Sequence, residues 1–506
     1  MVRPKSTARL RRSARRRLRA FRDDESGSVI VFTLFILVLM LIVGGMAVDF
    51  MRFESRRSKL QGITDRAVLA AADLDQSRDP ADVVRDYFVK AGMGSNLKGD
   101  PQVSPASLNR REVTAYGELR MNTFFLKLIG IDHLTAGSAA TAIEGVGNIE
   151  ISLVIDISGS MREVIPGTTV TRIARLREAS TNFVNTLLID DHKDRVSISL
   201  VPYSEHVGIG KDMFALFNMN KLHDFSYCVE FENAAYGGTA IDPTVLREQA
   251  QQWQFNPTID ADGDGDWDPG ATSGYYIRDI VMPICPTESY EQIVPISQNA
   301  ALLTGNIAQL TPRAGTSIFL GMKWGVALLD PSMRATYNAL PSGQRDAAFA
   351  ARPVNYATTD APNNTRKYIV LMSDGQNDNS NRLKASKYNT PSKRAHWAFE
   401  NFPYYWSTDI QYQTDYSHWM DPFYTASQGD TLLKNICNAA KSSPSNITIY
   451  TIAMGTDSDP DEDARGKAAL SDCASSPSMF YQTSGAELVA IFDDIAEQIT
   501  DLRLTQ

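Results

Sequence analysis

The longest apolar stretch of the chain lies near its amino terminus. Residues 29–48 form a run of 20 residues without a charged side chain. As a helix with about 1.5 Å of rise per residue, this run reaches roughly 30 Å, the thickness of the hydrocarbon layer of a bilayer. A buried helix of a soluble protein and a cleaved signal peptide are alternatives, but no small-residue cleavage pattern follows the run. The pattern therefore predicts a single transmembrane helix over 29–48.

The next hundred residues mix helical and strand patterns. Helix formers continue over 49–74, so the membrane helix is expected to extend outward. Residues 81–93 have the apolar spacing of an amphipathic helix, and residues 111–121 alternate like a strand. Residues 124–131 are typical of a short helix and turn. The range 49–148 is therefore predicted to be a helix followed by a small α/β stalk.

From residue 149 onward, apolar strands alternate with amphipathic helices. The expected strands are 149–158, 194–204, 367–375 and 447–455, and the expected helices are 171–188, 299–310, 317–329, 430–443 and 486–502. This alternation predicts an α/β domain over 149–506, with a doubly wound, mostly parallel sheet. Large insertions are expected at about 210–297, 331–365 and 376–429. Residues 206–210 are interpreted as an antiparallel edge strand, which would send the first insertion to the opposite end of the sheet.

Charge is divided unevenly along the chain. The net charge of -9 divides into +10 for residues 1–22, which contain no acidic residue, and -19 for the rest. A basic arm can bind nucleic acid, but here it precedes an apolar span. The positive-inside rule then predicts that the arm, residues 1–28, is cytoplasmic. About 450 residues would lie outside the cytoplasm, and no nucleic-acid partner is expected.

The cysteine count agrees with an oxidising compartment. The four cysteines are Cys228, Cys285, Cys437 and Cys473. An even number outside the cytoplasm favours two disulfides, and pairing of sequence neighbours, Cys228 with Cys285 and Cys437 with Cys473, is our hypothesis. Buried free thiols are the alternative. The absence of C-x-x-C and H-E-x-x-H patterns disfavours zinc and dithiol chemistry.

Oxygen-bearing side chains gather where two predicted strands end. Asp156 ends the strand at 149–158, and Asp374 ends the strand at 367–375. Ser158 and Ser160 follow the first strand, and Thr316 precedes a predicted helix. If the strands are neighbours, all five meet at one crevice, because parallel strands share their carboxyl edge. Hard oxygen ligands suit Mg²⁺, and also Mn²⁺ or Ca²⁺. The alternative is that Asp156 caps a turn and the serines are ordinary loop residues.

These five residues resemble the metal-ion-dependent adhesion site of von Willebrand factor A domains. The D-x-S-x-S pattern corresponds to Asp156, Ser158 and Ser160, and the later Thr and Asp correspond to Thr316 and Asp374. The resemblance covers about 149–506. It implies a module that binds a partner through a divalent cation, which accepts a carboxylate from that partner.

The amino-terminal part resembles the TadE/TadG-like Flp pilus-assembly proteins. The resemblance covers residues 25–72, and the stretch 473–506 is similar to the end of TadG-like chains. It implies a bacterial inner-membrane protein with one pilin-like anchor and a periplasmic or extracellular domain. Small pilin-like relatives have an acid five residues after their cleavage glycine, but here Phe32 follows Gly27 at that distance. The anchor is therefore expected to be retained.

Two insertions contain further candidate chemistry. The first resembles a calcium loop, with carboxylates at alternate positions: Asp260, Asp262, Asp264, Asp266 and Asp268. Ala271 stands where such a loop has its bidentate Glu, so a solvated acidic turn is the alternative. In the insertion at about 376–429, 11 of the 28 residues over 397–424 are aromatic. Such a segment is either a recognition surface over the crevice or a self-packed minidomain.

These features favour a non-enzymatic binding protein of a bacterial tight-adherence pilus system. Its expected partners are the inner membrane and a protein presenting a carboxylate, either a pilus or secretion component or a surface ligand. A metal-dependent hydrolase is one alternative, but no phosphate loop or serine-histidine-aspartate pattern is present. A structural stalk whose metal only stabilises the fold is the other.

Overall fold

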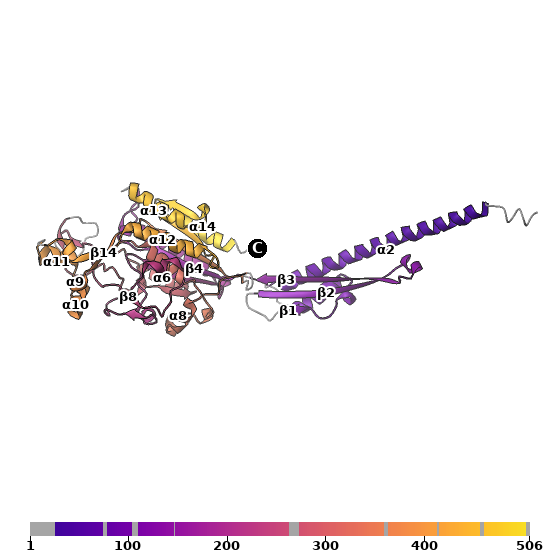
Figure 1. The fold of residues 1–506 in the computed structure, drawn as a ribbon, viewed down its shortest axis with the longest axis horizontal. Coiled ribbons are helices and arrows are strands. Elements are labelled where there is room, and N and C mark those ends of the chain that lie inside the picture. Colours follow the sequence, from indigo (N-terminus) through magenta and orange to yellow (C-terminus); the bar gives the residue numbers. More distant parts are fainter. Residues whose placement is uncertain are drawn as a thin grey trace, which may run out of the picture. The chain divides into compact units, whose positions relative to one another are not determined.

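The computed structural model divides the chain into two compact units, Met1–Gly145 and Val146–Gln506 (Figure 1). The residues whose structure is described are 26–73, 78–103, 110–145, 147–262, 273–358, 363–411, 414–455 and 460–501. Each unit has its own apolar core. The boundary lies close to the predicted one at residue 148.

The first unit is built on one long helix. α2 (Ser26–Ala72) runs without interruption through the predicted anchor and the predicted extension. Its first part is long and apolar enough to cross a membrane, and it is almost entirely exposed. This is compatible with a single-pass membrane anchor. Below it, α3 (Pro80–Lys90) and an antiparallel sheet pack on the second half of α2; the strands are β1 (Gln102–Val103), β2 (Arg110–Asn122) and β3 (His133–Gly145).

The second unit contains a six-stranded sheet. In spatial order the strands are β11 (Val294–Ser297), β5 (Val196–Tyr203), β4 (Ile149–Asp156), β12 (Arg366–Ser373), β15 (Thr448–Met454) and β16 (Phe480–Thr483). All pairs are parallel except β11 with β5. The antiparallel edge strand is therefore β11. Residues 206–210, which the sequence analysis assigned to that role, form no strand.

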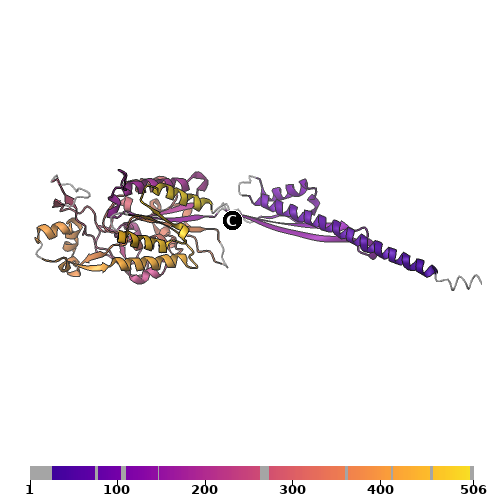
Figure 2. The same cartoon turned by 90° about the horizontal axis from the view of Figure 1, so that it is seen from above.

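Helices cover both faces of this sheet (Figure 2). One layer contains α7 (Ile318–Ala327), α12 (Ala426–Lys441) and α13 (Pro460–Cys473), and the other contains α4 (Arg172–Leu187), α6 (Ala300–Gln309) and α14 (Leu488–Asp501). The strands serve both layers because their side chains alternate: Val154 packs toward α7, while Leu153 and Ile155 pack in the α4 core. Strands buried on both faces are rich in apolar residues, and β4 is buried along its whole length.

Two insertions pack against each other, not at opposite ends of the sheet as predicted. Trp253 and Ile284 from the first share a buried cluster with Trp397 and Phe402 from the second. Backbone hydrogen bonds also join them: Asn401 N–H donates to Arg278 O at 2.7 Å, and Phe402 N–H donates to Gln254 O at 3.2 Å. The rings of the aromatic segment also pack on one another, so the segment is mainly part of a buried cluster shared with the first insertion. The first insertion contains α5 (Lys211–Phe214), β6 (Met219–Asn220), β7 (Val229–Glu230), β8 (Arg247–Gln249), β9 (Ile259–Asp260) and β10 (Tyr275–Tyr276). The aromatic insertion contains β13 (Ser380–Leu383), α9 (Ala385–Tyr388), α10 (Pro391–Phe399), α11 (Phe402–Thr408) and β14 (Met420–Tyr424).

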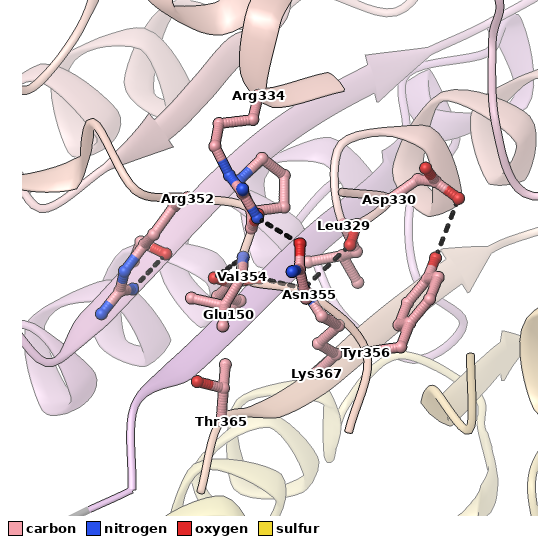
Figure 3. A network of polar contacts seen from close by, with 12 residues as sticks. Glu150, Leu329, Asp330, Arg334, Arg352, Val354, Asn355, Tyr356, Thr365 and Lys367 are labelled. Carbon is pink, nitrogen blue, oxygen red and sulfur yellow. Dashed lines mark hydrogen bonds and ion pairs between the residues drawn. The ribbon is translucent and has the colours of Figure 1, made fainter. Parts of the chain in front are cut away.

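The insertion at about 331–365, which includes α8 (Met333–Ala339), covers the amino ends of the strands (Figure 3). There the buried Glu150 of β4 pairs with Lys367 of β12 and accepts the N–H of Val354 at 2.8 Å. Arg352 donates to Ile149 O at 3.0 Å. Glu150 and Lys367 are thus an ion pair, and Arg352 is held by hydrogen bonds to backbone carbonyls and Ser197 Oγ, as burial of charge requires. The carboxyl ends of the strands lie at the other edge of the sheet.

Candidate metal centre

The two predicted carboxylates stand side by side at the carboxyl edge of the sheet. Asp156 is the last residue of β4, and Asp374 follows β12 directly. These strands are adjacent and parallel, with Ile155 opposite Met372, so both chains leave the sheet at the same level. Ser373 Oγ donates to Asp156 Oδ2 at 2.7 Å. The neighbour relation that the prediction required is therefore present.

A tight loop brings both serines to the carboxylates. The backbone N–H of Ser158 donates to Asp156 Oδ1 at 2.7 Å, which folds the loop back over the strand end. The hydroxyl oxygens of Ser158 and Ser160 are 3.1 Å apart, and Ser160 Oγ donates to Asp374 Oδ1 at 2.7 Å. A continuous chain of oxygen atoms thus links the end of β4 to the end of β12.

Thr316 reaches the same place from the loop between α6 and α7. Its N–H donates to Asp378 Oδ2 at 2.9 Å, and its carbonyl accepts the N–H of Asp378 at 2.8 Å. The N–H of Gly159, between the two serines, donates to Ala314 O at 3.1 Å. Thr316, Ser160 and Asp374 line one cavity of about 200 Å³. Asp156 and Ser158 are buried.

The electrostatics of this pair favour an added positive charge. Burial and the negative charge of Asp374 together raise the pKa of Asp156 to about 7, although hydrogen bonds from Ser158 and Ser373 oppose the shift. Burial also raises the pKa of Asp374, although hydrogen bonds from Ser160 and Arg172 oppose the shift. Two buried carboxylates are costly to ionise together, because each disfavours the charged form of the other. A dication would remove that cost.

Arg172 is a site residue that the sequence analysis missed. It is the first residue of α4, and its Nη1 donates to Asp374 Oδ2 at 2.9 Å, while Nη2 pairs with Glu163 at 2.9 Å. The arginine holds one oxygen of Asp374 and leaves Oδ1 to Ser160. A signal was available in the sequence: Arg172 lies on the same helical face as Leu176, Ala179 and Phe183, and an arginine on an apolar face needs a buried partner.

Tyr203 contacts the ends of both strands that carry the carboxylates. It is fully buried at the end of β5, and its hydroxyl donates to Met372 O at 2.9 Å and lies 3.5 Å from Asp156 Oδ2. Burial raises its pKa well above the ordinary value, so the hydroxyl remains a neutral donor. Nothing in the local sequence distinguished this tyrosine from a core residue.

The second predicted metal site, Asp260 to Asp268, lies largely outside the described residues. Asp260 ends β9 and Asp262 is exposed, whereas Asp264, Asp266 and Asp268 lie outside the described residues. Across the described part of the chain, no group of three or more His, Cys, Asp or Glu side chains could hold a metal ion. A cation beside Asp156 and Asp374 would therefore need hydroxyl oxygens in addition to the two carboxylates.

Both disulfides proposed from the cysteine order are present in the structure. Cys228 and Cys285 join two segments of the first insertion, and their Cα atoms are 5.9 Å apart. Cys437 in α12 bonds to Cys473 at the end of α13, with Cα atoms 5.2 Å apart. The second bond ties together two helices of the layer that covers β12 and β15.

Comparison with known proteins gives one family match and several similar structures. Residues 27–74 match the family described as "Putative Flp pilus-assembly TadE/G-like". No curated protein matches the chain. The von Willebrand factor domain of the type V pili tip protein Mfa5 from Porphyromonas gingivalis is 17% identical, with a TM-score of 0.33, over 70% of this chain and 96% of that one. The PilB minor pilin from Streptococcus sanguinis is 13% identical, with a TM-score of 0.33, over 81% and 80%.

Proposed function

We propose that this chain is a membrane-anchored protein of a bacterial Flp/Tad pilus system whose second unit is a von Willebrand factor A domain. That domain binds a carboxylate of a partner protein through a divalent cation. The observation that carries the proposal is the convergence of Asp156, Ser158, Ser160, Thr316 and Asp374, from three separate loops, at one edge of the sheet. The family match over 27–74 supports the pilus context.

The donor set fits a small hard cation. Ligands at about 2.1 Å around an octahedral Mg²⁺ lie about 3 Å from one another. The oxygen separations of 3.1 Å between the serines and 2.7 Å between Ser160 and Asp374 have that size. Asp156, Ser158, Ser160, Thr316 and Asp374 would hold the ion, with Mg²⁺ favoured and Mn²⁺ or Ca²⁺ possible in its place. When bound, the cation supplies a Lewis-acid position for an incoming carboxylate.

The cavity gives this position access to a partner. Ser160, Thr316 and Asp374 face the cavity, whereas Asp156 and Ser158 lie beneath it. A volume of about 200 Å³ admits a single side chain. Three of the five donors are neutral hydroxyls, so the negative charge at the site comes from two carboxylates, which together balance the charge of a dication. Arg172 offsets part of the charge of Asp374, so the occupied site would keep some net positive charge. An acidic side chain of the partner is therefore the complementary ligand.

The anchor determines where binding would take place. The ten basic residues that precede α2 favour a cytoplasmic amino terminus. The second unit would then face the periplasm or the cell exterior, where its two disulfides are stable. This is the placement that a pilus-associated binding protein requires.

An enzymatic role has less support. Among the described residues that line the cavity, none is a histidine or cysteine that could serve as base or nucleophile beside the ion. A purely structural metal is the stronger competitor, because the same five oxygens join three loops. The two roles differ in what metal removal does: a structural metal is needed for folding, and an adhesive metal is needed for the partner.

Metal binding is tested with Thr316, whose variants separate the hydroxyl from the shape of the side chain. Thr316→Val keeps the shape and removes the ligand oxygen, and Thr316→Ser, the matched control, keeps the oxygen. We expect isothermal titration with Mn²⁺ and Mg²⁺ to show binding to the native protein and to Thr316→Ser, and a loss of at least tenfold in affinity for Thr316→Val, about 1.4 kcal/mol. Equal affinities for both variants would remove Thr316 from the site.

Partner binding is tested by crosslinking from the cavity rim. A photoreactive residue at Gln376, which lines the cavity, should capture a partner in Mg²⁺ but not in EDTA. Asp156→Asn should abolish the capture while circular dichroism stays native. Capture that persists in EDTA, together with a collapsed fold in Asp156→Asn, would assign the metal a structural role instead.

A further inference from the structure

The tip of the β2–β3 hairpin is fastened to α2 where the apolar run ends. The carboxylate of Asp49, the residue after that run, accepts the backbone N–H groups of Phe124 at 3.1 Å, Phe125 at 2.7 Å and Leu126 at 3.0 Å. Asp49 is buried by these contacts. The Phe125 ring lies against Gly45, where an added Cβ would approach ring carbon at 2.2 Å. The tip is thus held at the level of the last turn of the predicted membrane span.

The tip presents large apolar side chains that are mostly exposed. Phe124 is 65% exposed, Leu128 70%, Ile129 49% and Ile131 40%. The apolar core of this unit lies farther along the hairpin, around Leu60 and Phe88. Four large apolar residues exposed within eight positions of a hairpin tip require a covering surface.

Basic groups border this apolar tip. The Arg52 guanidinium lies 4.2 Å from the centre of the Phe124 ring and pairs with Asp49 at 3.3 Å. Lys127 is exposed within the tip, and Arg120 lies on the adjoining strand. Asp132 is the exposed acid beside them. Aromatic and aliphatic side chains bordered by cations are typical of segments that lie at the headgroup level of a membrane.

We propose that the hairpin tip, residues 124–131, inserts into the headgroup–acyl boundary of the leaflet from which α2 emerges. The apolar surface of the tip is continuous with that of the span, since Phe125 contacts Gly45 and Asp49 joins the two. The first unit then has two membrane contacts, which prevent it from rotating about α2. The proposal rests on the anchor part of the proposed function and is independent of the metal.

Single added cysteines can measure the depth of the tip in the complete chain. All four native cysteines are in disulfides, so an added thiol is the sole labelling site. Leu128→Cys reports the tip. Leu69→Cys is the matched control, because Leu69 is 65% exposed, against 70% for Leu128, but lies about 30 Å farther along α2 than Asp49. Val38→Cys, within the span, reports insertion of the anchor.

Each variant is labelled with an environment-sensitive fluorophore and reconstituted in phosphatidylethanolamine–phosphatidylglycerol vesicles. We expect a nitroxide placed near the lipid headgroup to quench the label at 128 strongly and the label at 69 hardly at all. A nitroxide deep in the acyl chain should quench the label at 38. The label at 128 should also emit at a shorter wavelength than the label at 69.

Two results would overturn the proposal. A quenched label at 38 with unquenched labels at 128 and 69 would leave the anchor intact and show that the tip stays in water. A label at 128 whose emission follows the protein-to-lipid ratio, without nitroxide quenching, would assign the tip to a second copy of the chain. An unquenched label at 38 would overturn both the anchor and the insertion of the tip.

Discussion

Arg172 and Asp374 form a buried ion pair within the predicted metal site. The Asp374 side chain has no exposed surface, and that of Arg172 is 3% exposed. Removing one partner of a buried pair leaves an uncompensated charge, which costs far more than the pair contributes. Arg172 is therefore best understood as a positioning residue: it holds Asp374 and supplies positive charge that a cation would otherwise provide.

The variant Arg172→Met tests whether Arg172 supplies positive charge to Asp374. Without metal, the variant should lose about 3–5 kcal/mol of unfolding free energy, because Asp374 is left buried without a cation. With saturating Mg²⁺ the loss should be smaller, since the ion replaces the missing charge. Chemical denaturation with and without Mg²⁺ measures both values. The same loss in both conditions would show that Arg172 and the metal do not share Asp374.

At the scale of elements, α7 is pressed against the sheet beneath the site. A Cβ at Gly321 would meet the Tyr203 ring at 2.6 Å, and one at Gly325 would meet Val154 Cγ2 at 2.5 Å. These glycines allow the helix backbone to approach the strands closely. Because Tyr203 supports Met372 and Asp156, the position of α7 is coupled to the geometry of the carboxylates.

Gly321→Ala should therefore disturb both packing and site. We expect a loss of about 1–3 kcal/mol in unfolding free energy from overpacking, together with weaker Mn²⁺ binding. Gly305→Ala is the control, because Gly305 lies in helix α6 with nothing within 4 Å of an added Cβ. That change should stabilise the protein by about 0.5–1 kcal/mol, as alanine is the better helix former, and leave metal affinity unchanged. Thermal melting measures the stability of the two variants, and titration measures their Mn²⁺ affinity.

At the scale of the whole molecule, the two units are separate folding problems. The first buries α2 against α3 and its three-stranded sheet, and the second buries six strands between two helix layers. The predicted metal ligands and both disulfides belong to the second unit. Among the described residues, the two core clusters of the second unit contain only residues from 149 onward.

Residues 146–506 produced alone should therefore fold and bind metal. We expect the same melting temperature for this unit and the same Mn²⁺ affinity as in the full-length chain, measured by calorimetry under oxidising conditions. Reduction of both disulfides should lower its stability, because each closes a long loop of the unfolded chain. A fragment that folds but binds Mn²⁺ much more weakly would implicate the first unit in the site.

Predictions from sequence succeeded where the signal was local. The uninterrupted helix α2 follows from the absence of proline over 26–72, and the strands β4 and β12 follow from largely apolar runs. The placement of Asp156 and Asp374 at strand ends follows from the same pattern. The sequence predictions failed where distant segments compete for one position. The antiparallel edge strand is β11, not residues 206–210, because pairing with β5 depends on which segment returns to that edge of the sheet.

The amino-acid sequence by itself determined the apolar span, the buried strands and the oxygen-bearing residues at their ends, because each depends on neighbours only a few positions away. The tertiary structure decided the rest. It paired Arg172 with Asp374, joined the aromatic segment to the first insertion, and fastened the hairpin tip to Asp49. These contacts link residues tens to hundreds of positions apart. Such contacts form only once register and helix packing are set, and no local pattern encodes those.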